Sequence, residues 1–295
     1  MRIIKLKSGF TLIEIAIVLL IVTILLGYSV AMVPVQQELK QYREVNAEMN
    51  EIVNALVGFA QINGRLPCPD TTGIADASGD NSIIDGIEDT DDGFDESDLS
   101  IAYVDDFDAP VDGIIDGCRG YFGFLPAGTL GLNGDIDGLG RLLDPWGEPY
   151  GYHVSDVNAD ANGDGDDSLG DFGVGIDIVS PNGVREEGIS NVNPDLVICD
   201  DSDNSTAADV NCAAVSATNV YTSAAAVLIS SGKDRGKVAS DIQDENRDDF
   251  DNGTNDKVYT YSSRSDVTNA EYDDIVKWIS PNLLFSKMIE AGQLP

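Results

Sequence analysis

Oxygen-bearing side chains recur at alternate positions from residue 160 to residue 168, and another follows at residue 171. They are Asp160, Asn162, Asp164, Asp166, Ser168 and Asp171. Carboxylate, amide and hydroxyl oxygens are the ligands that Ca²⁺ takes in flexible loops. Gly165 stands at the sixth position, where a calcium loop makes its sharp turn. The spacing therefore predicts a calcium-binding loop.

The twelve-residue spacing of an EF-hand loop assigns the ligands in more detail. Asp160, Asn162 and Asp164 would bind through their side chains, Asp166 through its backbone carbonyl and Ser168 through a water molecule. Position twelve, Asp171, is Asp where Glu is usual, Asp167 occupies a position that is usually apolar, and flanking helices are not evident. We therefore expect structural calcium rather than a calcium sensor, and an ion-free polar loop is the alternative.

The balance of charged residues limits the classes of partner that the protein can bind. The chain of 295 residues has 17 Lys and Arg against 52 Asp and Glu, a formal net charge of −35. This excess excludes nucleic acid as a partner, because phosphate binding needs basic patches. No Lys or Arg lies between Arg65 and Arg119. That segment is either a solvated loop or a place for further cations.

The cysteines are four in number and form no CxxC pair, which argues against a zinc ribbon. They are Cys68, Cys118, Cys199 and Cys212. An even count in a secreted chain indicates disulfides. Pairing of neighbours, Cys68–Cys118 and Cys199–Cys212, is one of three connectivities, and four buried thiols are the alternative.

Groups for catalysis are not evident in the sequence. His153 is the only histidine and lies in a strand-like stretch, so it is expected to be structural. Carboxylates are plentiful, but none is marked as the acid and nucleophile of a glycosidase pair. We therefore expect no enzyme activity.

Glu14 stands near the start of an apolar run from Phe10 to about Val33. That run is long enough to span a bilayer as a helix, and the basic residues before it place the N-terminus in the cytoplasm. A carboxylate in such a span is costly and normally has a partner or a function.

The segment Lys7-Ser8-Gly9-Phe10-Thr11-Leu12-Ile13-Glu14 resembles the signature of type IV prepilins. The resemblance implies that prepilin peptidase cuts between Gly9 and Phe10 and that the new Phe10 amine is N-methylated. It also implies assembly with other pilin or pseudopilin subunits. Glu14 would pair with the Phe10 amine of a neighbouring subunit, because an unpaired charge among packed apolar helices is expensive.

The elements that must position these residues begin with one long helix from about Phe10 to Ile62. Apolar residues recur at helical spacing after the apolar run, Pro34 is expected to kink or locally melt the helix, and Asn63-Gly64 should end it. Four parts follow: a cleaved leader (1–9), a membrane and filament-core helix (10–33), its amphipathic continuation (34–63) and a globular head outside the cytoplasm (64–295).

The head reads as short strands between clusters of Gly, Asn and Asp, with a last helix. The expected strands are Glu148–Ser155, Asp195–Cys199, Ala224–Ser230 and Val258–Ser262, and the expected helix is Pro281–Ala291. A long helix packed on an antiparallel sheet is an α+β fold. Arg65-Leu66-Pro67-Cys68-Pro69 and Asp144-Pro145-Trp146-Gly147-Glu148-Pro149-Tyr150 also resemble segments of pilin-like proteins.

The sequence thus predicts a structural subunit of a type IV pilus or of a type II secretion pseudopilus. It would cross the inner membrane once before assembly and lie in a periplasmic or extracellular filament afterwards. The alternative is a membrane-anchored, calcium-dependent adhesin or binding module that never polymerises.

Overall fold

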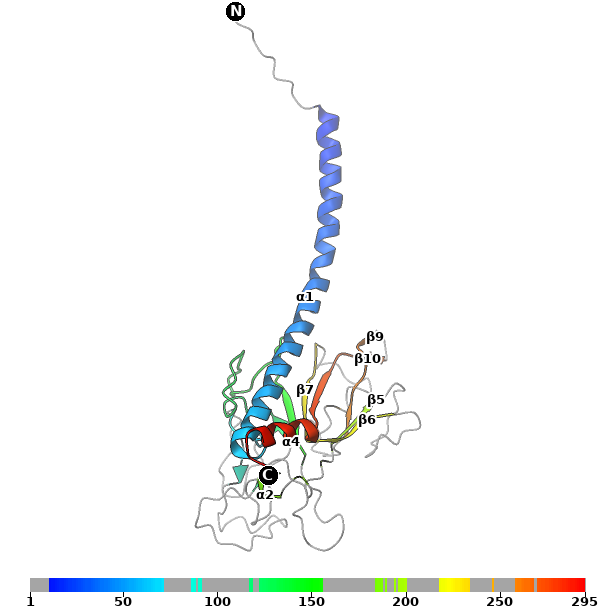
Figure 1. Ribbon diagram of the computed structural model, residues 1–295. Helices are drawn as coiled ribbons and strands as arrows, with labels where there is room; N and C mark the ends of the chain where they lie inside the picture. The colour runs from blue at the N-terminus through cyan, green and yellow to red at the C-terminus, as the bar shows by residue number, and fades with distance from the viewer. Residues whose placement is uncertain are drawn as a thin grey trace, which may run out of the picture. The chain divides into compact units, whose positions relative to one another are not determined.

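The computed structural model describes residues 11–71, 86–88, 90–91, 117–118, 122–155, 184–187, 189, 194, 196–200, 218–233, 246, 258–267 and 270–294 (Figure 1). The chain divides into two compact units, Met1–Asn46 and Ala47–Pro295. Helix α1 (Leu12–Asn63) contributes its first part to one unit and its last part to the other.

The described part of the first unit is helix. Leu12 to Leu26 is almost wholly apolar and exposed along its length, with Leu12 88% and Ile24 64% exposed. The helix continues through Pro34, so the melted turn expected there is absent. Of the residues that the structure describes, no helix combines the length and hydropathy that crossing a bilayer requires.

The second unit is built on a four-stranded sheet in the order β11-β7-β4-β3, and all of its pairings are antiparallel. The strands are β3 (Phe122–Phe124), β4 (Gly151–Val154), β7 (Ala226–Ser230) and β11 (Ile275–Ile279). Alternate residues of a strand point to opposite faces. Lys277 on β11 accordingly donates to Asn50 of α1, while its neighbours Val276 and Trp278 face the other side. The last part of helix α1 therefore covers one face of this sheet.

A second sheet covers the other face, with the order β6-β5-β8. Its strands are β5 (Leu196–Asp200), β6 (Thr218–Ala224) and β8 (Val258–Thr260). Val227, Ile229 and Val276 of the first sheet pack against Leu196 and Ile198 of the second in one buried cluster. Strand β5 pairs antiparallel with β6 but parallel with β8, so the expectation of a purely antiparallel head is wrong at this pair.

Shorter elements complete the described part of the head. They are β1 (Thr90–Asp91) paired with β2 (Gly117–Cys118), β9 (Ser265–Val267) paired with β10 (Ala270–Tyr272), and the four-residue helix α2 (Val184–Glu187).

The last helix, α4 (Pro281–Glu290), packs beside the end of α1. Ser280 caps α4 by accepting a hydrogen bond from the Leu283 N–H, and Pro281 begins it. Gln61 of α1 donates to the Lys287 carbonyl, and Gln293 donates to the Ile62 carbonyl. The two helix ends are thus bonded to each other.

Gly64 ends α1, as its place after Asn63 predicts. Its φ of 82° lies in the left-handed region, where glycine has no steric penalty, and its N–H closes the last turn on Ala60. A Cβ at this position would lie 2.8 Å from the Cβ of Arg185. Any larger residue would therefore be strained and would clash with α2.

The α+β class is confirmed, with the end of α1 packed on mainly antiparallel sheets. Three helical positions at the end of α1, Met49, Ile52 and Leu56, are buried, as their spacing predicts. All four predicted strands and the last helix are present, with ends shifted by up to three residues. Within the two larger sheets, β3, β6 and β11 have no counterpart among the predicted strands.

Candidate functional site

The start of α1 is closed by a reciprocal pair of side chains, Thr11 and Glu14. The Thr11 backbone N–H and hydroxyl both donate to Glu14 Oε2, at 3.0 and 2.9 Å. The Glu14 N–H in turn donates to the Thr11 hydroxyl at 3.4 Å. This is a capping box, in which two side chains satisfy backbone groups that the first helical turn leaves unpaired.

Glu14 keeps part of its binding capacity in this arrangement. Both of its side-chain bonds use Oε2, and Oε1 makes no hydrogen bond to any residue of the described part of the chain. The side chain is exposed. One carboxylate oxygen therefore holds the helix start while the other is open to a partner. Gly9 and Phe10, the predicted processing residues, lie outside the described residues.

Sequence reasoning singled out Glu14 but missed its cap. The signal was present, because Ser or Thr followed by Glu three residues later, before an apolar run, is the capping-box pattern. Thr11-Leu12-Ile13-Glu14 has that spacing. Glu14 thus has a local structural role besides any role toward a neighbour.

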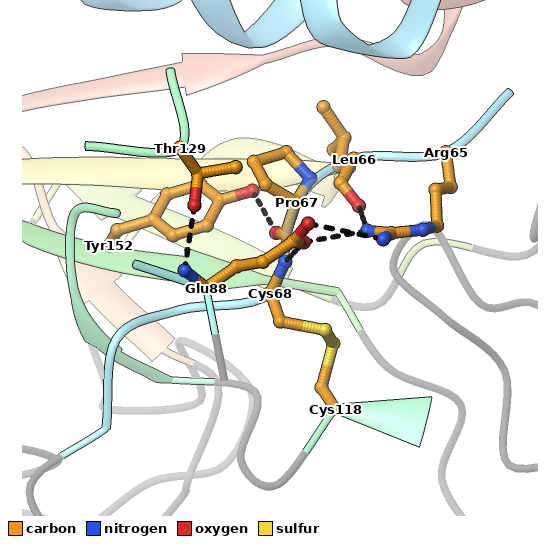
Figure 2. Close-up of a disulfide and its surroundings, with 8 residues drawn as sticks. All are labelled: Arg65, Leu66, Pro67, Cys68, Glu88, Cys118, Thr129 and Tyr152. Carbon is orange, nitrogen blue, oxygen red and sulfur yellow. Dashed lines mark hydrogen bonds and ion pairs between the residues drawn. A yellow bond between two sulfur atoms is a disulfide. The ribbon is translucent and has the colours of Figure 1, made fainter. Parts of the chain in front are cut away.

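The turn after α1 is joined covalently to a distant segment. Cys68 and Cys118 form a disulfide with Cα atoms 5.3 Å apart, the pairing of neighbours that the sequence favoured (Figure 2). Both cysteines are buried. Cys199 is disulfide-bonded as well, whereas Cys212, its predicted partner, lies outside the described residues.

A buried ion pair stands beside this disulfide. Arg65 donates through its two terminal guanidinium nitrogens to Glu88, at 2.8 and 3.2 Å, and the Cys68 N–H donates to the same carboxylate at 3.0 Å. The side chains of Arg65 and Glu88 are 8% and 15% exposed. The Glu88 N–H donates to the Thr129 hydroxyl. Glu88 is therefore the centre of a network that ties three segments together (Figure 2).

Asp70 adds a second tie to the same region. Its Oδ2 accepts from the Gly86 N–H at 2.8 Å, and its backbone pairs with Phe124 at the edge of β3. The Tyr152 hydroxyl donates to the Pro67 carbonyl. Burial, with the nearby Glu88 charge second, raises the pKa of Tyr152 well above its usual value, so the hydroxyl stays protonated as a donor.

Asp144 organises the turn before β4. Its Oδ1 accepts from the backbone N–H groups of Trp146 and Glu148, and its Oδ2 accepts from the Ser230 hydroxyl at 2.6 Å. Burial raises the pKa of Asp144, although these hydrogen bonds oppose the shift. Each donor is part of the fold, so this carboxylate is structural.

His153 is buried in β4, and its Nδ1 shares a short hydrogen bond with the Tyr259 hydroxyl between the two sheets. This contact agrees with the structural role expected for the single histidine.

The predicted calcium ligands, Asp160 to Asp171, lie outside the described residues. Across the described ranges, no group of three or more His, Cys, Asp or Glu side chains gathers in a way that could hold a metal ion. The structure therefore brings together Cys68 and Cys118 among the predicted site residues, and it describes Glu14 in its capping box.

Comparisons with known proteins agree with the N-terminal geometry. No curated protein and no solved structure matches the chain. Residues 4–29 match the family model described as the prokaryotic N-terminal methylation motif. That range includes the capping box and the start of the exposed apolar helix. The chain therefore carries the N-terminal signature of the type IV pilins and pseudopilins.

Proposed function

We propose that this protein is a structural filament subunit, assembled through α1 into a type IV pilus or a type II secretion pseudopilus. The observation that carries the proposal is the open Oε1 of Glu14 at the start of an exposed apolar helix. Proteins with this signature are structural rather than catalytic.

The apolar surface of α1 supports packing against something other than water. Large side chains from Leu12 to Leu26 are 42% to 88% exposed, on all sides of the helix. Burying an apolar side chain of this size contributes about 1.5–3 kcal/mol. A bilayer before assembly, and the helices of neighbouring subunits afterwards, would each bury this surface.

Glu14 supports a defined register between those helices. A carboxylate buried among apolar helices is stabilised only when a cation meets it. Cleavage after Gly9 would create a positively charged amine at Phe10. This amine would be the cation closest in sequence to Glu14, and each neighbouring subunit would carry one. The Oε1 of one subunit would accept that amine from its neighbour, and Oε2 would continue to cap its own helix.

Three substitutions separate assembly from capping. Glu14→Gln keeps a capping-box side chain but removes the charge, and Glu14→Ala removes both. Thr11→Ala removes the hydroxyl bonds of the cap, which weakens it by about 1 kcal/mol, but keeps the charged Glu14 carboxylate. We expect both Glu14 variants to be processed normally yet to yield at least about tenfold fewer filaments in sheared fractions, because the buried amine loses its counter-charge. Thr11→Ala should assemble. Normal assembly of Glu14→Gln would show that Glu14 is only a cap.

Processing is tested by the intact mass of the protein from its native membranes. A chain that begins at Phe10 with one added methyl group supports the filament pathway. A chain that still begins at Met1 supports the alternative, a membrane-anchored binding module. That alternative also predicts that Glu14→Gln changes nothing at the cell surface.

The proposal includes calcium in the head. Its support is the ligand spacing from Asp160 to Asp171 and the formal charge of −35, because crowded carboxylates are stabilised by divalent cations. Calcium would stabilise the loop rather than signal through it.

A further inference from the structure

An exposed surface that is both apolar and basic lies where α1 ends. Ile62 is 75% exposed, more than any other large apolar side chain described beyond Leu26. The Arg185 N–H donates to the Gly64 carbonyl, and the Arg185 side chain lies over Gly64. Gln293 donates to the Ile62 carbonyl and accepts from Arg185 at 3.4 Å. These contacts join three segments into one surface, which we call the basic end: Ile62, Arg185 and Gln293.

The charge of Arg185 is not compensated within the described part of the head. Its side chain is exposed, and its guanidinium makes no ion pair with any of the carboxylates that the structure describes. By contrast, Arg65 and Arg141 are each paired with a carboxylate. The basic end therefore offers a guanidinium beside an exposed isoleucine to a carboxylate of another molecule.

A second surface, of opposite charge, lies on the loop before β4 (residues 135–142). Ile136 and Leu139 on this loop are 50% and 45% exposed. Asp135 beside them is exposed and has no ion-pair partner among the described residues. We call Asp135, Ile136 and Leu139 the acidic loop. Each of the two surfaces thus combines exposed apolar side chains with one uncompensated charge.

Contacts within the loop and with α1 determine where the acidic loop is held. Asp137 accepts from the backbone N–H and the guanidinium of Arg141, which closes the loop. The Tyr150 N–H donates to the Leu142 carbonyl at the end of the loop, and the Tyr150 hydroxyl donates to Glu48 of α1. From Glu48 to its last residue, α1 rises by about 22 Å at 1.5 Å per residue. The two surfaces are therefore anchored at different levels along α1.

We propose that the basic end of one copy of this chain binds the acidic loop of the next copy. Arg185 would pair with Asp135, while Ile62 would pack on Ile136 and Leu139. The inference rests on the proposed filament role and adds a contact between heads to the packing of α1. A filament needs two different surfaces that fit each other, because a surface that binds its own copy closes a dimer. Two surfaces that are offset along α1 and opposite in charge meet this requirement.

The overall negative charge of the head does not prevent this contact. Exposed charges that lie further apart than the Debye length, about 8 Å at physiological ionic strength, are largely screened from each other. The side chains that face each other therefore decide the electrostatic energy of the contact, and here they are a guanidinium and a carboxylate. Such a pair also orients the two surfaces, because like charges brought together in another register would repel.

Exchange of the two charges tests the pair in cells that express the full chain, with filaments measured in sheared fractions. Arg185→Glu and Asp135→Arg should each lower the yield at least about fivefold, because each places like charges opposite each other. The double variant should return to within about twofold of the unaltered protein, because an opposite pair is restored. Each variant should keep its Tm within about 2 °C, because both side chains are exposed.

The matched control is Arg185→Glu combined with Glu51→Arg, a change at an exposed carboxylate of α1. This variant has the same net charge as the rescuing double variant but does not restore the pair, so its yield should stay low.

Cysteines at the two positions test the contact directly. Filaments of the Arg185→Cys/Asp135→Cys variant, treated with a short bismaleimide, should give a ladder of multimers in denaturing electrophoresis. Each single cysteine variant should give no ladder, because the contact joins two different surfaces.

Three results overturn the inference and leave the filament role intact. They are normal filament yield from either single charge variant, rescue by Asp135→Arg no greater than by Glu51→Arg, and a double cysteine variant that forms no ladder or crosslinks to a different protein. If the unaltered protein yields no filaments and still begins at Met1, the proposed function fails, and this inference fails with it.

Discussion

At the scale of single residues, Glu88 joins three segments of the head through its hydrogen bonds. One carboxylate accepts from Arg65 at two nitrogens and from the Cys68 N–H, and all three groups are largely buried. Removing one partner of a buried ion pair leaves the other charge without compensation. The stability of the turn after α1 therefore depends on this side chain more than on exposed ion pairs.

Glu88→Gln is expected to lower the free energy of unfolding by about 3 kcal/mol, because it leaves the Arg65 guanidinium buried without a counter-charge. Urea unfolding followed by circular dichroism measures the change. The control is Glu290→Gln, which breaks the exposed Lys287–Glu290 pair and should cost below about 0.5 kcal/mol. Equal losses in the two variants would contradict the role given to Glu88.

The raised pKa of Asp144 predicts how its contribution to the free energy of unfolding changes with pH. Its folded pKa is raised by burial above the unfolded value of 3.8, so the folded state binds the proton more tightly. The contribution to stability is therefore full below the unfolded pKa and is lost as pH rises through the folded pKa.

Asp144→Asn isolates this effect, because it keeps a side chain of the same shape and cannot ionise. The stability of the unaltered protein relative to Asp144→Asn should fall between about pH 4 and pH 7, as measured by urea unfolding at both values. The contributions of the other carboxylates to the pH dependence are present in both proteins and cancel in this difference. A difference that rises with pH would contradict the sign.

At the scale of elements, local sequence patterns predicted most helices and several strands, but they did not predict which strands pair. Helix α1, helix α4 and four strands follow from periodicity, caps and Gly–Asn–Asp turns. Strand β3 has three residues and too little pattern to be found, whereas β11 reads Ile-Val-Lys-Trp-Ile and could have been found. The parallel pairing of β5 with β8 joins segments that are distant along the chain, and local sequence does not encode it.

In the candidate site, too, the features with a local sequence signal were predicted and those that depend on distant contacts were not. Glu14 was found because a carboxylate in an apolar run is unusual, and the Cys68–Cys118 bond because the cysteines are neighbours in the sequence. The Arg65–Glu88 pair was missed because 23 residues separate its partners, and no spacing rule reaches that far. Contacts set by tertiary packing were the ones that sequence reasoning lacked.

The disulfide gives a prediction for the loop that it closes. With a sequence separation of 50 between Cys68 and Cys118, the chain-entropy relation gives a stabilisation of about 4 kcal/mol. The Cys68→Ala/Cys118→Ala variant should lose about that amount in urea unfolding. The control is Ile289→Ala, a truncation at the exposed face of α4, which should change the stability by less than about 0.5 kcal/mol. A loss below about 1 kcal/mol in the cysteine variant would contradict the entropic account.

At the scale of the whole molecule, charge dominates. The proposed cleavage after Gly9 would remove three of the 17 basic residues, which would leave 14 against 52 acidic residues and a formal side-chain charge of −38. Self-repulsion of this size keeps a protein soluble and opposes its compact state. Any cation that binds the folded head is therefore expected to stabilise it.

We expect calcium to stabilise the head by more than the screening of its negative charges. With a Kd of about 10⁻³ M, about 10 mM calcium would raise the Tm of the head by about 3–6 °C. Magnesium at the same ionic strength should give a smaller rise, and Asp160→Asn/Asp164→Asn should abolish the difference between the two ions. Differential scanning calorimetry measures each Tm. Equal shifts from both cations would leave screening as the whole effect.

The disulfide next to the end of α1 also bears on proteolysis. Residues 69–117 form a covalently closed loop, since Cys68 and Cys118 are joined at its base. Loop tips with polar residues are common sites of nicking in proteins. A protease that cuts once inside this loop opens the ring but does not divide the molecule, because the disulfide still connects the two pieces. The nicked protein would therefore keep its head attached to its helix as long as the bond stays oxidised.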